Sequence, residues 1–235
     1  MGVYAIGDLH LPGMSENKSM SRFGSEWNNH FLKISEDWQS RVSDDDIVII
    51  AGDISWAMKL DDALEDLNSI SELPGRKIMI RGNHDYWWGS VTKVRSITKN
   101  NIYILQNDSV ELDDFIFGGT RGWNLVNSPD LKDNSKFDTN DVKIYQRELL
   151  RLRLSLEAFK TSNKIKIGIM HFPPVFSNMK DTDFSSIFTE YGAQYVVYGH
   201  LHADSIKLAF NGLHDGVDYS LVSADALNFK LKRII

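Results

Sequence analysis

The residues of this chain that could do chemistry gather at five places, and each place directly follows a short apolar run. They are Asp8 with His10, Asp53, Asn83 with His84 and Asp85, His171, and His200 with His202. Carboxylate, imidazole and amide groups can bind metal ions, and the first two can also move protons. Alone, each of these residues is more often a turn or capping residue at a strand end. Five such ends together favour one shared site.

Two of the five places repeat one pattern, in which two polar residues flank a leucine. The segments are Asp8-Leu9-His10 and His200-Leu201-His202. In an extended segment, residues two apart point to the same side, because side chains alternate along a strand. Each pair can therefore face one metal-binding region while its leucine faces the core.

The number and type of donor atoms predict a centre of two metal ions. One tetrahedral ion cannot use them all, whereas two ions about 3.5–4 Å apart can. Mixed imidazole and carboxylate ligation favours Mn, Fe, Zn or Ni, as divalent or mixed-valence ions, over Mg or Ca. The chain has no cysteine, so thiolate ligands and disulfides are excluded. The expected ligands are Asp8, His10, Asp53, Asn83, His171, His200 and His202.

The charge of this ligand set favours a phosphate substrate. Asp8 and Asp53 contribute about two negative charges against about four positive charges from two divalent ions. The excess positive charge would attract a phosphate and activate a bridging water, so we expect attack by a metal-bridging hydroxide. His84 can donate a proton to the leaving oxygen, because an imidazole titrates near neutral pH.

The elements that must position these residues are those of an α/β protein. Apolar runs at residues 3–6, 47–50, 78–80, 165–170 and 195–198 predict buried strands, and ligand sites lie at the carboxyl ends of such strands. Apolar residues at helical spacing predict helices within residues 27–42, 60–70, 91–97 and 145–159. The short runs at 102–105, 110–112 and 115–117 predict an antiparallel meander, and residues 205–235 predict about three more strands.

The domain organisation expected from the sequence is a single domain over residues 1–235. The chain shows no repeat, low-complexity segment or linker, and its length fits one large domain. Residues 120–141 are irregular and polar, and they are longer than most connections in a compact domain. We expect this segment to be an insertion or lid near the site.

The five motifs, in this order, resemble those of the calcineurin-like metallophosphoesterase superfamily, a family of phosphohydrolases. The motifs are Asp8-Leu9-His10, Gly52-Asp53, Gly82-Asn83-His84-Asp85, His171 and Gly199-His200-Leu201-His202. The resemblance implies a four-layer α/β/β/α sandwich, in which two mixed β-sheets are flanked by helices. It also implies a dinuclear metal site at the carboxyl ends of the strands, and hydrolysis of a phosphate monoester or diester.

The resemblance further assigns a role to each motif residue. It implies a first metal held by Asp8, His10 and His202, a second held by Asn83, His171 and His200, and Asp53 between the two. It makes His84 the proton donor or a phosphate contact, with Asp85 orienting it. The chain departs from the family where Ile54-Ser55-Trp56 follows Asp53 without the further acidic residue of many members. That departure weakens assignment to the phosphoprotein phosphatase branch.

Two further residues are candidates for substrate binding. Arg121 follows an apolar run and could clamp a phosphate with two hydrogen bonds, although a solvent-exposed turn arginine would look the same. Trp87, in Tyr86-Trp87-Trp88, could form an aromatic wall beside the metals, or it could pack in the core. We interpret His30 as a packed boundary residue and His214 as part of a hairpin turn.

Composition limits the partners and the compartment. The formal charge of -6 and the pI of about 5.6 argue against broad nucleic-acid binding, so we expect a phosphorylated small molecule as the substrate. No apolar stretch approaches membrane-spanning length, and residues 1–6 lack the basic region of a signal peptide. We therefore expect a cytoplasmic protein without a membrane partner, and the sequence sets no oligomeric state.

Two other functions fit the same fold. One is a catalytically silent binding or scaffold protein, and the other is a nuclease. A silent relative should have lost ligands or the acid, and this chain retains both. The nuclease is weakened by the acidic charge balance.

Overall fold

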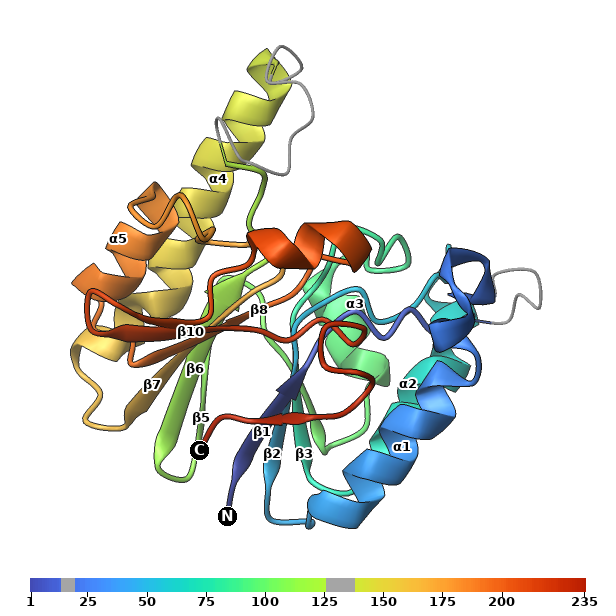
Figure 1. The fold of residues 1–235 in the computed structure, drawn as a ribbon. Helices are drawn as coiled ribbons and strands as arrows, with labels where there is room; N and C mark the ends of the chain where they lie inside the picture. The colour runs from blue at the N-terminus through green and yellow to red at the C-terminus, as the bar shows by residue number, and fades with distance from the viewer. Residues whose placement is uncertain (14–19, 126–137) are drawn as a thin grey trace. The chain divides into compact units, whose positions relative to one another are not determined.

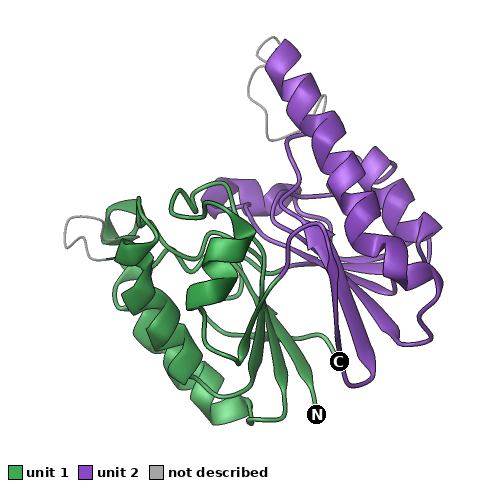
Figure 2. Cartoon of the chain, turned by 180° about the vertical axis from the view of Figure 1, so that it is seen from behind, with its two compact units in different colours: residues 1–104, 222–235 green, residues 105–221 purple. Residues whose placement is uncertain are grey.

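The polypeptide forms two compact units, each with its own β-sheet. The structure is a computed structural model that describes residues 1–13, 20–125 and 138–235. Unit 1 comprises residues 1–104 and 222–235, and unit 2 comprises residues 105–221 (Figure 2).

The sheet of unit 1 is parallel except for one edge strand (Figure 1). Strands β1 to β4 pair in parallel in sequence order, and β11 adds an antiparallel edge beside β1. Parallel pairing brings the carboxyl ends of β1, β2 and β3 to the same edge of the sheet. The strands, in spatial order, are β11 (Lys232–Arg233), β1 (Val3–Ile6), β2 (Ile47–Ile50), β3 (Arg76–Met79) and β4 (Ile102–Ile104).

Three helices join these strands and pack on the sheet of unit 1. They are α1 (His30–Arg41), α2 (Leu64–Glu72) and α3 (Val91–Ile97), with 3₁₀ turns at Met20–Phe23, Ser25–Trp27 and Asp61–Ala63. The hydrophobic core combines α1, α2 and strand residues such as Trp38, Ile70 and Ile50, none of them measurably exposed. The Ser90 hydroxyl caps α3 by accepting the backbone N–H of Lys93 at 3.3 Å, as a Ser before a helical run predicts.

The sheet of unit 2 has a parallel centre and two antiparallel edges. Strands β6, β7, β8 and β10 are parallel, so the ends of β7 and β8 also share one edge. The strands, in spatial order, are β5 (Ser109–Leu112), β6 (Phe115–Thr120), β7 (Ile165–Met170), β8 (Tyr195–Tyr198), β10 (Val217–Leu221) and β9 (Gly212–His214).

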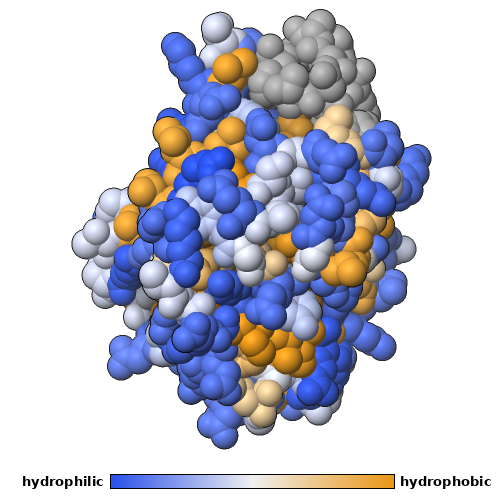
Figure 3. All heavy atoms as spheres, turned by 90° about the vertical axis from the view of Figure 1, so that its left-hand side faces the viewer, coloured by the Kyte–Doolittle hydropathy of each residue, from blue (hydrophilic) through white to orange (hydrophobic). Residues whose placement is uncertain are grey.

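The described residues of unit 2 contain the α-helices α4 (Thr139–Leu156) and α5 (Asp183–Glu190), with 3₁₀ turns at Glu157–Lys160 and Ala203–Leu208. Helix α4 crosses β6 so closely that a Cβ on Gly118 would lie 2.8 Å from the Leu156 side chain. The outer face of α4 leaves Leu150 and Leu154 each 63% exposed. On the face shown in Figure 3, hydrophobic side chains reach the surface at separate places among hydrophilic ones.

Most predicted elements are confirmed, and so are the two mixed sheets with flanking helices. The predicted antiparallel meander is wrong in its first strand, since β4 pairs in parallel with β3 in unit 1. Helix α3 lies between β3 and β4, and a helical crossover returns the chain parallel to the strand it left. Only β5 and β6 form the expected hairpin.

Two expectations about organisation stay predictions: the single domain, and the packing of the two sheets into four layers. Of the expected lid at residues 120–141, residues 126–137 lie outside the described residues. Among the described residues, no helix combines the length and the apolar character needed to cross a membrane.

Candidate functional site

In unit 1, the loops after β1 and β2 stay hydrogen-bonded to each other beyond the ends of the strands. The Asp8 N–H donates to the Gly52 carbonyl, and the His10 N–H donates to the Asp53 carbonyl, both at 2.9 Å. Further on, the Leu11 N–H donates to Ile54 at 2.9 Å. The main chains that carry the three expected ligands are therefore fixed against each other.

Four of the expected ligands have left-handed backbones, although none is a glycine. The φ angles are 58° at Asp8, 46° at His10, 50° at Asp53 and 75° at His200. Such conformations are strained for residues with a Cβ and cluster at functional sites. The loops after β1, β2 and β8 thus direct these side chains differently from the residues of a regular strand.

Asp53 connects two of the other site residues of unit 1. Its carboxylate is 1% exposed, and Oδ2 lies 3.8 Å from Nε2 of His10. Its Oδ1 accepts the backbone N–H of His84 at 2.7 Å. The loop after β3 can approach this closely because residue 82 is glycine: a Cβ there would overlap the carboxylate and main-chain nitrogen of Asp53.

Asp85 holds the loops of unit 1 together. The side chain is fully buried, and Oδ1 accepts the main-chain N–H groups of Ile54 at 2.8 Å and Ser55 at 3.1 Å. Oδ1 also accepts the Trp87 indole N–H at 3.0 Å, and Oδ2 accepts the Gly82 N–H at 2.7 Å. These contacts assign Asp85 to bracing the β2 and β3 loops, while the prediction that it orients His84 stays a prediction.

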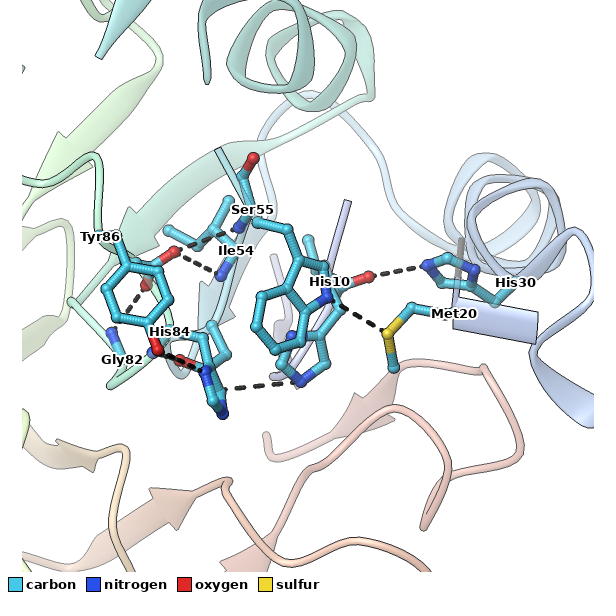
Figure 4. A network of polar contacts seen from close by, with 12 residues as sticks. His10, Met20, His30, Ile54, Ser55, Gly82, His84 and Tyr86 are labelled. Atoms are coloured by element: carbon cyan, nitrogen blue, oxygen red, sulfur yellow. Dashed lines mark hydrogen bonds and ion pairs between the residues drawn. The ribbon is translucent and has the colours of Figure 1, made fainter. Parts of the chain in front are cut away.

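His84 lies among aromatic rings and is partly exposed. Its Nδ1 is 3.3 Å from the Tyr86 hydroxyl, and its ring centroid is 4.4 Å from that of Trp56. The ring centroid of His10 lies 5.8 Å from that of His84. Figure 4 shows His10, His84 and Tyr86 grouped together. Asn83, one residue before His84, is also partly exposed.

The structure argues against Trp87 as a substrate contact. Its ring belongs to the hydrophobic core, it is 3% exposed, and its N–H donates to Asp85. The alternative of core packing is the one the structure favours, because the indole has an apolar site and a buried acceptor. Tyr86, which is 50% exposed, is the aromatic residue of this segment that is open to solvent.

In unit 2, three imidazoles stand at the ends of β7 and β8. His171 is fully buried, its N–H donates to the Arg121 carbonyl at 3.2 Å, and its carbonyl accepts the Gly199 N–H at 3.1 Å. The His171 and His200 rings are 5.2 Å apart. The His202 N–H donates to Ser205 Oγ at 2.9 Å. The loops after β6, β7 and β8 are thus linked within unit 2.

The Arg121 guanidinium contacts a buried acid and an aromatic ring. Nη2 lies 4.0 Å from Oε1 of Glu148, and the guanidinium lies 4.8 Å from the Trp123 ring centroid. Glu148, which is fully buried, also accepts from Arg151 at 2.6 Å and from Thr120 at 2.5 Å. Arg121 therefore has a partner in unit 2 whether or not it contacts a phosphate.

Two supporting residues behind the unit 1 loops were not predicted to be part of the site. Asp66 of α2 accepts the Gly13 N–H at 2.8 Å and the Ser55 hydroxyl. Burial raises the pKa of its carboxyl to about 6, although both hydrogen bonds oppose this. His30, which is buried as predicted, places Nε2 2.8 Å from the Leu9 carbonyl, and burial lowers its pKa. Neither residue carries a sequence signal beyond its place on a helix.

Comparisons with known proteins agree with the motifs. A family model described as calcineurin-like phosphoesterase matches residues 1–204. The gene 66 protein of Mycobacterium phage L5 is 36% identical over 78 residues, which are 33% of this chain and 37% of the phage protein. A protein of unknown function from Aquifex aeolicus (AQ665) has a similar fold, with a TM-score of 0.53 and 14% identity over 99% of this chain and 95% of that one.

Proposed function

Because the chain belongs to the calcineurin-like phosphoesterase family, we propose that it hydrolyses a phosphorylated small molecule with the help of two metal ions. The observation that carries the proposal is that every donor motif of the family stands just after a strand, in a chain whose match spans both units. The family consists in general of metal-dependent phosphoesterases. A monoester and a diester both fit the proposal.

The donor chemistry of unit 1 fits a metal ion. His10 Nε2 and Asp53 Oδ2 are 3.8 Å apart, within the separation of about 4 Å that two ligands of one ion can reach with bonds of about 2.1 Å. Asp8 and Asp53 are buried carboxylates, and a bound cation would offset the cost of burying their charge. The mixture of carboxylate and imidazole favours Mn, Fe, Zn or Ni.

The resemblance to the family supports one division of the ligands. Asp8, His10 and His202 would hold one ion, Asn83, His171 and His200 would hold the other, and Asp53 would contribute to both. Bound there, the ions would supply Lewis acidity towards the phosphate and lower the pKa of an attacking water. Asn83 is a neutral ligand, so the ligand set leaves the centre net positive and attractive to a phosphate.

Two residues outside the ligand set act on the substrate. His84 donates a proton to the leaving oxygen as the ester bond breaks. Arg121 contacts a phosphate oxygen with its guanidinium, a group whose planar N–H donors match phosphate geometry. The net charge of -6 makes a small phosphate ester a better fit than a nucleic acid, which binds proteins mainly through cationic side chains.

The test is an Asp53→Asn variant, which keeps the size of the side chain and removes its charge. The protein is loaded separately with Mn, Fe, Zn or Ni and assayed with bis(4-nitrophenyl) phosphate and 4-nitrophenyl phosphate. We expect D53N to lose metal and to be slower by at least about 100-fold, since even outer-shell partners of metal ligands account for 10–100-fold.

The matched control is Asp181→Asn, whose side chain is 91% exposed in unit 2. We expect D181N to retain metal content and turnover. A D53N protein that is as active as D181N would overturn the proposal. A wild-type protein that binds no metal and hydrolyses neither ester would instead indicate a scaffold or binding protein.

A further inference from the structure

Trp56 lies against both the proposed acid and an expected metal ligand. Its ring centroid is 4.4 Å from that of His84, with the two planes at 45°. It also stacks on His10, with the ring centroids 4.9 Å apart and the two planes at 19°. Trp56 is the third residue after Asp53, in the segment where many family members have a further acidic residue and this chain has none.

The indole of Trp56 is itself held in place. Its Nε1–H donates to the Met20 sulfur at 3.2 Å, and its backbone N–H donates to the Leu11 carbonyl at 2.8 Å. The ring is partly buried at the edge of the unit 1 core. A side chain fixed at its main chain and at its far end can restrict the rotamer of a neighbour.

The His84 ring has a defined orientation as a result. Its backbone N–H is held by Asp53, its Nδ1 is 3.3 Å from the Tyr86 hydroxyl, and one side of the ring lies on Trp56. With Nδ1 directed to Tyr86, Nε2 is the atom assigned to the substrate. Positioning a proton donor within hydrogen-bond reach of the leaving oxygen is a condition for acid catalysis.

We propose that Trp56 is a positioning residue for His84, whose ring it holds by its aromatic face. This inference rests on the proposed function. In that reaction the oxygen of water bonds to phosphorus, the bond from phosphorus to the leaving oxygen breaks, and that oxygen takes the proton from His84 Nε2. The proton that water releases restores His84 through solvent.

The rival explanation is that Trp56 acts through His10 or through packing alone. Leaving-group chemistry separates the two explanations. A 4-nitrophenolate leaves without help from an acid, whereas a phenolate needs its oxygen protonated, so loss of the acid slows the phenyl ester much more. A packing or metal defect slows both esters equally.

The experiment compares Trp56→Ala and Trp56→Phe with the wild type on 4-nitrophenyl and phenyl esters of the same phosphate class. We expect W56A to lower kcat on the phenyl ester by about 10–100-fold, below the 10²–10⁴-fold of complete acid catalysis. We expect the 4-nitrophenyl ester to change by less than about 3-fold at unchanged KM and metal content. W56F retains an aromatic face and should recover most of the rate.

A double-mutant cycle with His84→Ala completes the test. If Trp56 acts through His84, adding W56A to H84A causes no further loss, because coupled residues are not additive. A further loss in that background, equal losses on both esters or a loss of metal would assign Trp56 to His10 or to the fold.

One readout does not depend on activity. In the zinc-loaded protein, the NMR shift of the His84 ring proton Hε1 should move in W56A, since the indole ring current acts on it. An unchanged shift refutes the contact and with it the inference. A wild-type protein that hydrolyses neither ester, with the shift change intact, refutes the proposed function instead.

Discussion

The site residues of unit 1 and those of unit 2 are held in different ways. In unit 1 the ligand-bearing loops are bonded to each other through the main chain, and the buried Asp85 joins the β2 and β3 loops with hydrogen bonds from four donors. In unit 2 the main chain also links the loops, through the bonds of His171 to Arg121 and Gly199, but it is aromatic packing that holds the side chains: the imidazoles of His171 and His200 pack on each other and on Phe172, whose ring lies 4.2 Å from that of His200.

The difference follows from the chemistry of the two sets. Unit 1 carries the carboxylates Asp8 and Asp53, which are buried and stand on strained backbone. Burying a charge and holding a left-handed backbone both cost free energy, so contacts from the surrounding loops must compensate for this cost. The imidazoles of His171 and His200 carry no carboxylate charge, although His200 also has a left-handed backbone, and aromatic packing orients them together with the main-chain bonds of their loops.

The largest effect should come from Gly82→Ala, which disturbs the bracing in unit 1. The added Cβ would overlap Asp53, and the atoms it meets include main chain that cannot move aside. We expect a loss of at least about 3 kcal/mol of stability, the upper range for overpacking, and a loss of bound metal. Thermal unfolding and metal analysis measure both.

Gly89→Ala is the matched control, because no heavy atom beyond Gly89 and its two chain neighbours lies within 4 Å of its Cβ position. We expect G89A to stay within about 0.5 kcal/mol of the wild type. If G82A equals G89A in stability and metal content, the loops of unit 1 are not braced as described.

The next effect concerns Asp66, which supports the same loops from α2. Its folded pKa of about 6 lies above the unfolded value of 3.8, so the folded state binds more protons between these values. Asp66 therefore lowers stability as the pH rises from about 4 to about 6, and its effect is constant above that.

We expect the stability of Asp66→Asn, relative to the wild type, to rise by up to about 3 kcal/mol over this pH range. Urea unfolding at several pH values measures the difference, with D181N as the exposed control. If the difference in the free energy of unfolding between D66N and the wild type does not vary between pH 4 and pH 6.5, burial does not raise the pKa of Asp66.

The smallest effect concerns Arg121 in unit 2. Arg121→Met should raise KM by about tenfold, the value of one charge-assisted hydrogen bond to phosphate, with little change in stability. Stability should hold because Arg151, 2.6 Å from Glu148, still neutralises that buried acid. An unchanged KM with a lower Tm would mean that Arg121 only neutralises Glu148 and does not contact the phosphate.

Local pattern was enough to predict most of the fold. The apolar runs at β1, β2, β7 and β8 were found because buried strands are continuous apolar segments. The partner of β4 was not predictable, since a three-residue strand carries too little pattern to choose between a parallel and an antiparallel neighbour.

The roles around the loop after β3 depended on residues distant in the sequence. Asp85 was predicted to orient His84 or to cap a turn, and its bracing role was not predicted, because its Oδ1 accepts N–H groups that lie 30 and 31 positions earlier. From the sequence, Trp87 could form an aromatic wall or pack in the core, and the structure places it in the core. In the sequence, Trp56 stands out only because its segment lacks a further acidic residue. Its contacts with His10 and His84 join three loops that are distant in the sequence.

The sequence by itself determined the family, the donor residues and their places after strands, because motif chemistry and strand periodicity are local properties. Tertiary structure alone decided which side chains brace the loops and which rings surround His84. The physical reason is that the burial and the hydrogen-bond partners of a side chain depend on which distant segments contact each other. The spacing of neighbouring residues does not reveal those contacts.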